Sequence, residues 1–165
     1  MNQEPKSGSS HTTTAHMGKS HYRRLLIMTV LSFVAMYVLM YAMVNAASNA
    51  LPNLNQFYMA GLMTAAMIVI ELGLMGDMYR NRRLNASIAA AGVVALIVLW
   101  VFIRRQTAIS DRQFLRSMIP HHAGAILMCE QASIRDAEIR QLCQNIVSSQ
   151  QAEIDQMKAK LRELR

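Results

Sequence analysis

Three long apolar blocks constrain the fold of this chain more than any other feature. Residues 25–44 and 85–103 contain no charged side chain, and residues 57–78 contain only Glu71 and Asp77. A membrane hydrocarbon core of about 30 Å is crossed by roughly 20 helical residues, and a helix satisfies its own backbone polar groups there. Buried helices of a soluble bundle would keep a polar face. We therefore expect an all-α protein with three transmembrane helices at these positions.

The distribution of Lys and Arg predicts the orientation of these spans. Basic residues precede the first span and separate the second from the third, whereas residues 46–56 carry no charge. Because cytoplasmic loops hold the excess positive charge, we predict a multi-pass protein of a bacterial inner membrane. Residues 1–22 would be a disordered cytoplasmic tail, residues 23–105 the membrane domain, and the rest periplasmic. Arg104 and Arg105, after the third span, oppose this orientation.

The C-terminal residues 106–165 change to charged, amphipathic sequence. Ser110 followed by Gln113 has the form of a capping box, which predicts a helix over about 111–133. A second helix with one apolar stripe is predicted over about 137–164, and the short link makes the pair an antiparallel hairpin. Two helices alone bury little surface. We therefore expect two copies to pair into a four-helix bundle.

The first hairpin helix gathers soft donor side chains on one face. At 100° per residue, an arc of about 120° contains Met118, His121, His122, Met128 and Cys129. Thioether, imidazole and thiolate donors suit Cu(I) better than Mg, Ca or Mn, and the thioethers disfavour Zn. The alternative is that the methionines are ordinary core residues and that the histidines are idle or satisfied within the core.

Folding of the hairpin brings part of the second helix toward this face. Met118 comes within about a turn of Glu153 and Met157, and His121 comes opposite Gln150. A buried Gln needs a hydrogen-bond partner, and a ligand histidine usually donates its second ring nitrogen to a carbonyl or carboxylate. Gln150 or Glu153 fits that role.

The same folding brings the two cysteines of the chain, Cys129 and Cys143, opposite each other. An oxidising periplasm permits a disulfide bond. Additional copper ligands and buried free thiols are the alternatives, and the spacing does not choose among the three.

Several positions along both predicted hairpin helices follow a pattern seen in a known family: Phe114, Met118, Ile119, Pro120, His121, His122, Ala125, Ile126, Met128, Gln150, Glu153, Ile154 and Met157. By these residues the segment over about 108–162 resembles domain of unknown function 305. That resemblance implies an extracytoplasmic, ferritin-like helical bundle associated with copper binding and copper tolerance. It also places five metal-binding positions at Met118, His121, His122, Met128 and Met157.

Together these observations predict a membrane-anchored protein that binds or buffers Cu(I) outside the cytoplasm, in copper homeostasis or resistance. Its metal ligands would be Met118, His121, His122, Met128 and Met157, with Cys129, Cys143 and Glu153 as further candidates. We expect a lipid bilayer, a second copy of the chain and copper-handling proteins as partners, and no nucleic acid or organic cofactor. We expect no catalysis, because neither hairpin helix carries the Glu-x-x-His pair of di-iron oxidases.

Two alternative functions remain open. In one, the chain is a membrane subunit whose hairpin mediates protein–protein assembly. In the other, the spans form a copper transporter that the hairpin supplies, with Glu71 as an intramembrane carboxylate. Two rows of methionines would then carry the ion: Met36, Met40 and Met43 in the first span, and Met59, Met63 and Met67 in the second.

Overall fold

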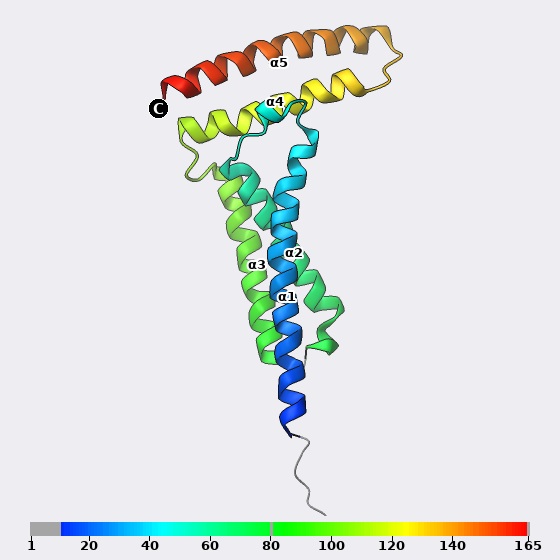
Figure 1. Cartoon of the computed structure of the whole chain (residues 1–165), viewed down its shortest axis with the longest axis vertical. Helices are drawn as coiled ribbons and strands as arrows, with labels where there is room; N and C mark the ends of the chain where they lie inside the picture. Colours follow the sequence, from blue (N-terminus) through cyan, green and yellow to red (C-terminus); the bar gives the residue numbers. More distant parts are fainter. Residues whose placement is uncertain (1–10, 80, 165) are drawn as a thin grey trace, which may run out of the picture.

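The computed structural model describes residues 11–79 and 81–164, and within these ranges it contains helices and no strand. Three of the helices stand side by side as a stem, and two lie across one end of it as a crossbar (Figure 1). The stem comprises α1 (His11–Leu39), α2 (Leu54–Leu74) and α3 (Arg82–Arg105), and the crossbar comprises α4 (Asp111–Gln131) and α5 (Ala137–Glu163). Three short 3₁₀ helices, η1 (Met40–Met43), η2 (Ala47–Asn49) and η3 (Gly76–Met78), lie in the connections.

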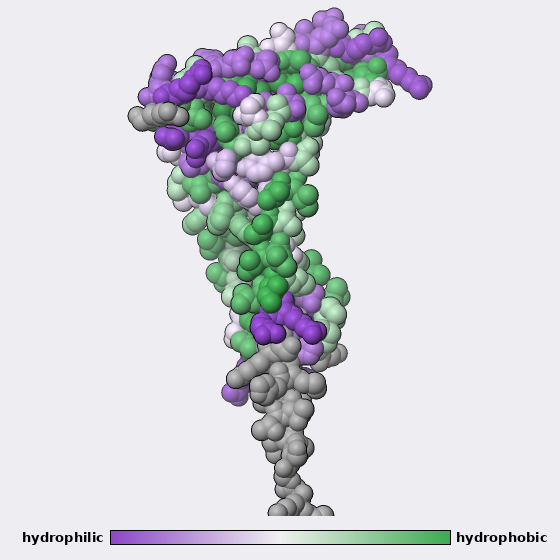
Figure 2. Space-filling model, in the orientation of Figure 1, coloured by the Kyte–Doolittle hydropathy of each residue, from purple (hydrophilic) through white to green (hydrophobic). Residues whose placement is uncertain are grey.

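The stem has the dimensions and the surface of a membrane domain. Three helical segments are long and apolar enough to cross a bilayer, namely His21–Met43, Leu54–Leu74 and Arg82–Arg105. Figure 2 shows their apolar surface as a band between a hydrophilic crossbar and a hydrophilic opposite end. Large side chains such as Leu74, which is 82% exposed, point away from the protein. The expectation of an all-α chain with three such helices is therefore confirmed.

Within the stem, α2 is the central helix and packs against both α1 and α3. The contact with α3 depends on Gly92, which is buried, because a Cβ atom there would lie 2.8 Å from Cγ2 of Val69. Close helix approach at small residues is a common basis of packing in membranes, where burial of apolar surface gives little driving force.

A polar cluster joins the helices at the end of the stem away from the crossbar. Tyr22 donates a hydrogen bond to Oδ1 of Asn85 at 2.6 Å, and Nδ2 of Asn85 donates to the carbonyl of Tyr79 at 2.8 Å. The Tyr79 hydroxyl lies 3.3 Å from Oε1 of Glu71. Burial, with the nearby Glu71 carboxylate, raises the pKa of the Tyr79 hydroxyl, so it stays a donor and partners the carboxylate of the apolar helix α2.

The helix bounds in the stem differ by several residues from those predicted, and two of the differences concern the predicted tail and the end of the second span. Residues 11–22, predicted as part of a disordered tail, are helical and continue into the first span, so that prediction is wrong for them; residues 1–10 lie outside the described residues. Once the span has nucleated the helix, each further residue that becomes helical adds one backbone hydrogen bond, so the helix can extend into the residues before the span. The second helix ends at Leu74 rather than 78, where the Met75 amide donates to the carbonyl of Glu71 and η3 follows.

The crossbar helices form the predicted antiparallel hairpin, and α4 begins at Asp111 as predicted. However, the predicted capping box does not form. Ser110 is the N-cap residue, but its side chain makes no cap hydrogen bond. The Gln113 side chain instead accepts a hydrogen bond from the Leu54 backbone amide at 3.2 Å, and the Asn55 side-chain amide donates to the Ser117 hydroxyl at 3.2 Å. These contacts fasten the start of α4 to the start of α2.

The core of the crossbar is completed by the stem of the same chain. Its fully buried side chains are Ile119, Ile126 and Ile154, and partly buried Val44 and Leu51, from the connection between α1 and α2, pack against them. The prediction of a dimer assumed that the hairpin had nothing in its own chain to pack on, and that assumption was wrong. Dimerisation itself stays a prediction.

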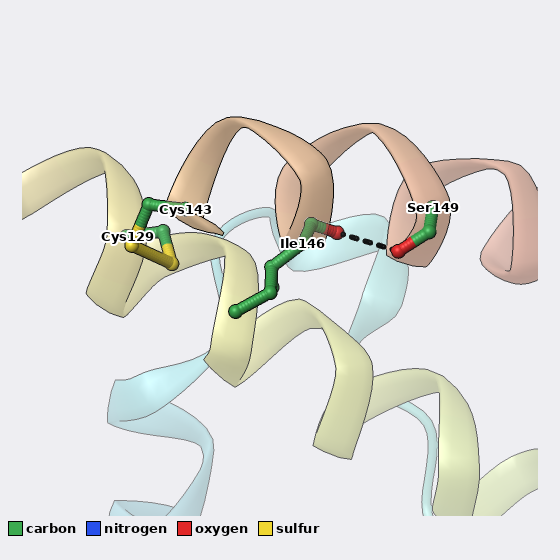
Figure 3. The surroundings of a disulfide bond; sticks show 4 residues. All are labelled: Cys129, Cys143, Ile146 and Ser149. Atoms are coloured by element: carbon green, nitrogen blue, oxygen red, sulfur yellow. Dashed lines mark hydrogen bonds between the residues drawn. A yellow bond between two sulfur atoms is a disulfide. The ribbon is translucent and has the colours of Figure 1, made fainter. Parts of the chain in front are cut away.

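A disulfide bond between Cys129 and Cys143 joins α4 to α5 near the hairpin turn (Figure 3). The two Cα atoms are 5.2 Å apart and the two residues are separated by 14 positions in sequence. Of the three alternatives that the spacing left open, the structure shows the disulfide. Neither sulfur is then a thiolate, so the candidate roles of Cys129 and Cys143 as copper ligands do not apply to the oxidised chain.

Candidate metal centre

The predicted ligands separate onto two sides of α4. Met118, His121 and Met128 line a groove between α4 and the crossbar end of the stem. His122 and Met157 lie on the other side, in the contact between α4 and α5. The arc on the helical wheel therefore spans the boundary between two different surroundings.

The groove has a volume of about 440 Å³ and is open to the exterior. Its floor on α4 includes Gly124, where a Cβ atom would lie 3.3 Å from the Met43 carbonyl oxygen, so glycine permits the close approach of α4 to η1. The described residues that line it are Met40, Met43, Val44, Asn53, Asn55, Gln56, Met59, Ser117, Met118, Pro120, His121, Gly124, Ala125 and Met128.

The chemistry of this lining is soft and electrically neutral. Five methionine thioethers and one imidazole face the groove, and none of the described lining residues is acidic or basic apart from that imidazole. Thioethers and imidazole are donors for Cu(I). Because no carboxylate is present to offset an ion's charge, a monovalent cation is less costly to hold there than a divalent one.

His121 and His122 have opposite surroundings. The His122 ring is buried, with Nδ1 2.9 Å from the Met118 carbonyl oxygen and Nε2 2.6 Å from Oε2 of Glu153. A carbonyl oxygen only accepts, so Nδ1 carries a hydrogen, and Nε2 shares a proton with the carboxylate. Both ring nitrogens of His122 are thus engaged by the protein, whereas the exposed His121 lies at the groove.

The structure therefore revises several predicted roles. Glu153 partners His122 rather than His121, and Met157 packs against the apolar core of the crossbar. No hydrogen bond joins Gln150 to His121 among the described residues, and the buried Oε1 of Gln150 has no hydrogen-bond partner there. No cluster of three or more His, Cys, Asp or Glu side chains is placed to hold a metal in the described part of the chain. A metal centre here depends on methionine.

Sequence reasoning did not assign Met40, Met43 and Met59 to the same site as α4. They were grouped instead into rows along the spans, and those rows are not continuous. Met36 lies against Thr64, with its sulfur 3.7 Å from the hydroxyl oxygen, between α1 and α2. Met63 is 46% exposed and lines a separate apolar depression beside Trp100. Only the methionines at the crossbar end face the groove.

Comparison with known families identifies the domain that contains most of the residues lining the groove. The family model described as Domain of unknown function (DUF305) matches residues 53–161. The chain belongs to the DUF305 family. The match begins well before the segment over about 108–162 that the sequence motif indicated, so the DUF305 region includes α2 and α3 as well as the crossbar.

The chain is also similar to an uncharacterized protein of Acanthamoeba polyphaga mimivirus. The two are 37% identical over 142 residues, which cover 84% of this chain and 91% of the viral protein. No solved structure matches the chain.

Proposed function

We propose that this DUF305 protein binds Cu(I) in the groove between α4 and the stem, and buffers or hands on the ion outside the cytoplasm. The observation that carries the proposal is the position of Met118, His121 and Met128 in one neutral, methionine-lined groove. His121 supplies the imidazole, because both nitrogens of His122 already have partners.

The choice of Cu(I) follows from the donor set. Zinc sites use thiolate, imidazole and carboxylate ligands, and calcium and magnesium use oxygen ligands. A lining in which methionine predominates suits a soft monovalent ion better than any of these. Thioethers also bind without losing a proton, so the affinity of such ligands does not depend on deprotonation as that of thiolates does.

The membrane setting of this function is part of the proposal. We infer a bacterial inner membrane, with the crossbar on the periplasmic side and the start of α1 on the cytoplasmic side. An odd number of spans supports ends on opposite faces, and α1 begins at the end of the stem away from the crossbar (Figure 1). Arg104, which opposed this orientation, lies over the Trp100 ring at 5.6 Å, as an interfacial anchor would.

Association with other proteins also belongs to the proposal. Two crossbars would pair into a four-helix, ferritin-like bundle, and copper-handling proteins would exchange the ion with the groove. Exposed Ile139 and Leu142 on α5 support an apolar contact with a second copy. The mass of the purified protein in mild detergent measures this directly: a dimer supports the pairing, and a monomer at all concentrations excludes it.

Cu(I) affinity of the full-length protein tests the metal site. A competition titration against a Cu(I) chelator should show that His121→Ala weakens binding by about tenfold or more, with a smaller loss for Met118→Leu. Met157→Leu is the matched control, because Met157 belongs to the same helix pair but packs in its core; its affinity should stay within about twofold of wild type.

Two outcomes would overturn the proposal. One is a wild-type protein that stays free of copper when Cu(I) is in excess. The other is a His121→Ala variant with wild-type affinity. If either groove variant instead disturbed complex formation while copper content stayed unchanged, the alternative role in protein–protein assembly would be supported.

A further inference from the structure

We propose that the stem supplies thioether ligands to the same ion, through Met40, Met43 and Met59, so that bound metal joins the crossbar to the membrane helices. This inference rests on the proposed function, because it concerns the ion that the groove would hold. It adds that the metal site is shared between the two parts of the molecule and is incomplete in either part alone.

The reach of the α4 side chains limits what that helix can do by itself. Met118 and Met128 are ten positions apart, which is about 15 Å along a helix axis. An extended methionine side chain plus one metal–sulfur bond covers roughly 6–7 Å. The two thioethers therefore cannot join one ion, and α4 offers at most His121 with one methionine.

The missing donors lie on the opposite wall of the groove. Met40 and Met43 belong to η1, at the crossbar end of the first span, and Met59 belongs to the second turn of α2. Met43 is 53% exposed and Met59 is 39% exposed, and both line the groove, so neither side chain is enclosed in a core. Methionine has three rotatable bonds, which lets thioethers from both walls converge on an ion.

The neighbouring architecture holds the two walls together. The Leu54 backbone amide donates to the Gln113 side chain, and the Asn55 side-chain amide donates to the Ser117 hydroxyl. The start of α2 is therefore fixed against α4 one turn before Met59. Gly124 brings the η1 backbone against α4 beside Met43. The three stem methionines are thus positioned by the contacts that attach the crossbar, and the expected consequence is a metal ion that strengthens this joint.

A triple variant of the full-length protein, Met40→Leu with Met43→Leu and Met59→Leu, tests the shared site. Leucine keeps the volume and apolar character of methionine at little cost in stability. The triple variant should bind Cu(I) about tenfold or more weakly, and X-ray absorption of the bound copper should show fewer sulfur neighbours than in wild type. Met63→Leu is the matched control, since Met63 lies one turn after Met59 on the same helix but lines a separate depression instead of the groove; its affinity and sulfur count should not change.

The outcomes distinguish this inference from the proposed function. If His121→Ala weakens binding while the triple variant matches wild type, the copper site stands and the stem contribution is excluded. If the wild-type protein binds no Cu(I), both are excluded. Should the triple variant lose helix content, the single variant Met43→Leu, at an exposed position, replaces it: an unchanged sulfur count would exclude Met43 as a ligand, and a decrease would support it.

Discussion

The two sides of α4 carry the same residue types in different surroundings. On the side facing the stem, His121 is exposed at a neutral groove lined by methionines. On the side facing α5, the next residue, His122, is buried, and both of its ring nitrogens have protein partners. Met128 is 55% exposed at the groove, whereas Met157 packs against Ile119 and its neighbours.

This comparison leads us to expect that a donor residue serves as a ligand or as a structural residue according to the element that it faces. The α5 side provides an apolar core, a carboxylate and a disulfide, which satisfy or bury the side chains they meet. The stem side provides open space and further thioethers. Substitutions on the α5 side should therefore change stability, and substitutions on the groove side should change copper binding.

The largest effect is expected in the core of the crossbar. Ile126→Ala should lower the free energy of unfolding of α4 and α5 by about 2–5 kcal/mol, because it removes buried methyl groups and leaves a cavity. Hydrogen exchange of the crossbar amides measures this locally. Glu130→Ala, at an exposed position near the end of α4, is the control and should cost less than about 0.5 kcal/mol. Equal costs for the two variants would contradict the assignment of the core.

The disulfide is expected to be next in magnitude. Replacement of Cys129 and Cys143 by Ser should destabilise the crossbar by about 3 kcal/mol, since the bond closes a short loop of the unfolded chain. Copper affinity should stay close to that of wild type. Thiol titration with and without reductant verifies the bond, and a loss of copper affinity without a loss of stability would restore the ligand role of the cysteines.

A smaller effect is expected from the carboxylate beside His122. Glu153→Gln keeps the shape of the side chain but removes its charge, and should destabilise the crossbar by about 1 kcal/mol, a value reduced because Glu153 is largely exposed. Thermal unfolding compared with exposed Glu130→Gln measures it. A large decrease in Cu(I) affinity for Glu153→Gln alone would place this carboxylate at the metal instead.

The smallest effect is expected at the joint between stem and crossbar. Ala108 has a φ of 59°, in the left-handed region that glycine adopts at less cost. Ala108→Gly should raise the free energy of unfolding by up to about 1 kcal/mol, without changing copper affinity, because the residue belongs to neither side of α4. A destabilised variant in denaturant titration would show that the local conformation is not strained.

Much of the fold could be predicted because its signals are local. Uninterrupted apolar blocks indicated the three spans, and the capping-box form of Ser110 and Gln113 indicated the start of α4 at Asp111, although the capping hydrogen bonds do not form. The role of Gln113 could not be predicted, because a capping box and a contact with Leu54 require the same side chain, and the tertiary contact prevailed. Helix α1 extends through residues 11–22 although their composition is that of a tail.

The candidate site was predicted only in part, for a related reason. Helical periodicity gives the angle between His121 and His122 but does not say which neighbour lies at each angle. The fold of the crossbar over the stem decides that, and it also brings Met43 and Met59 to α4 from distant parts of the sequence. Their only sequence signal was a position near the ends of two spans that share a short connection.

Separate substitution of the two adjacent histidines tests the division of α4 most directly. Cu(I) affinity and thermal stability would be measured on full-length His121→Ala and His122→Ala. We predict that His121→Ala loses affinity by about tenfold or more at nearly wild-type stability, whereas His122→Ala loses stability and retains copper when folded. The opposite pattern, with copper lost only in His122→Ala, would contradict the groove as the metal site.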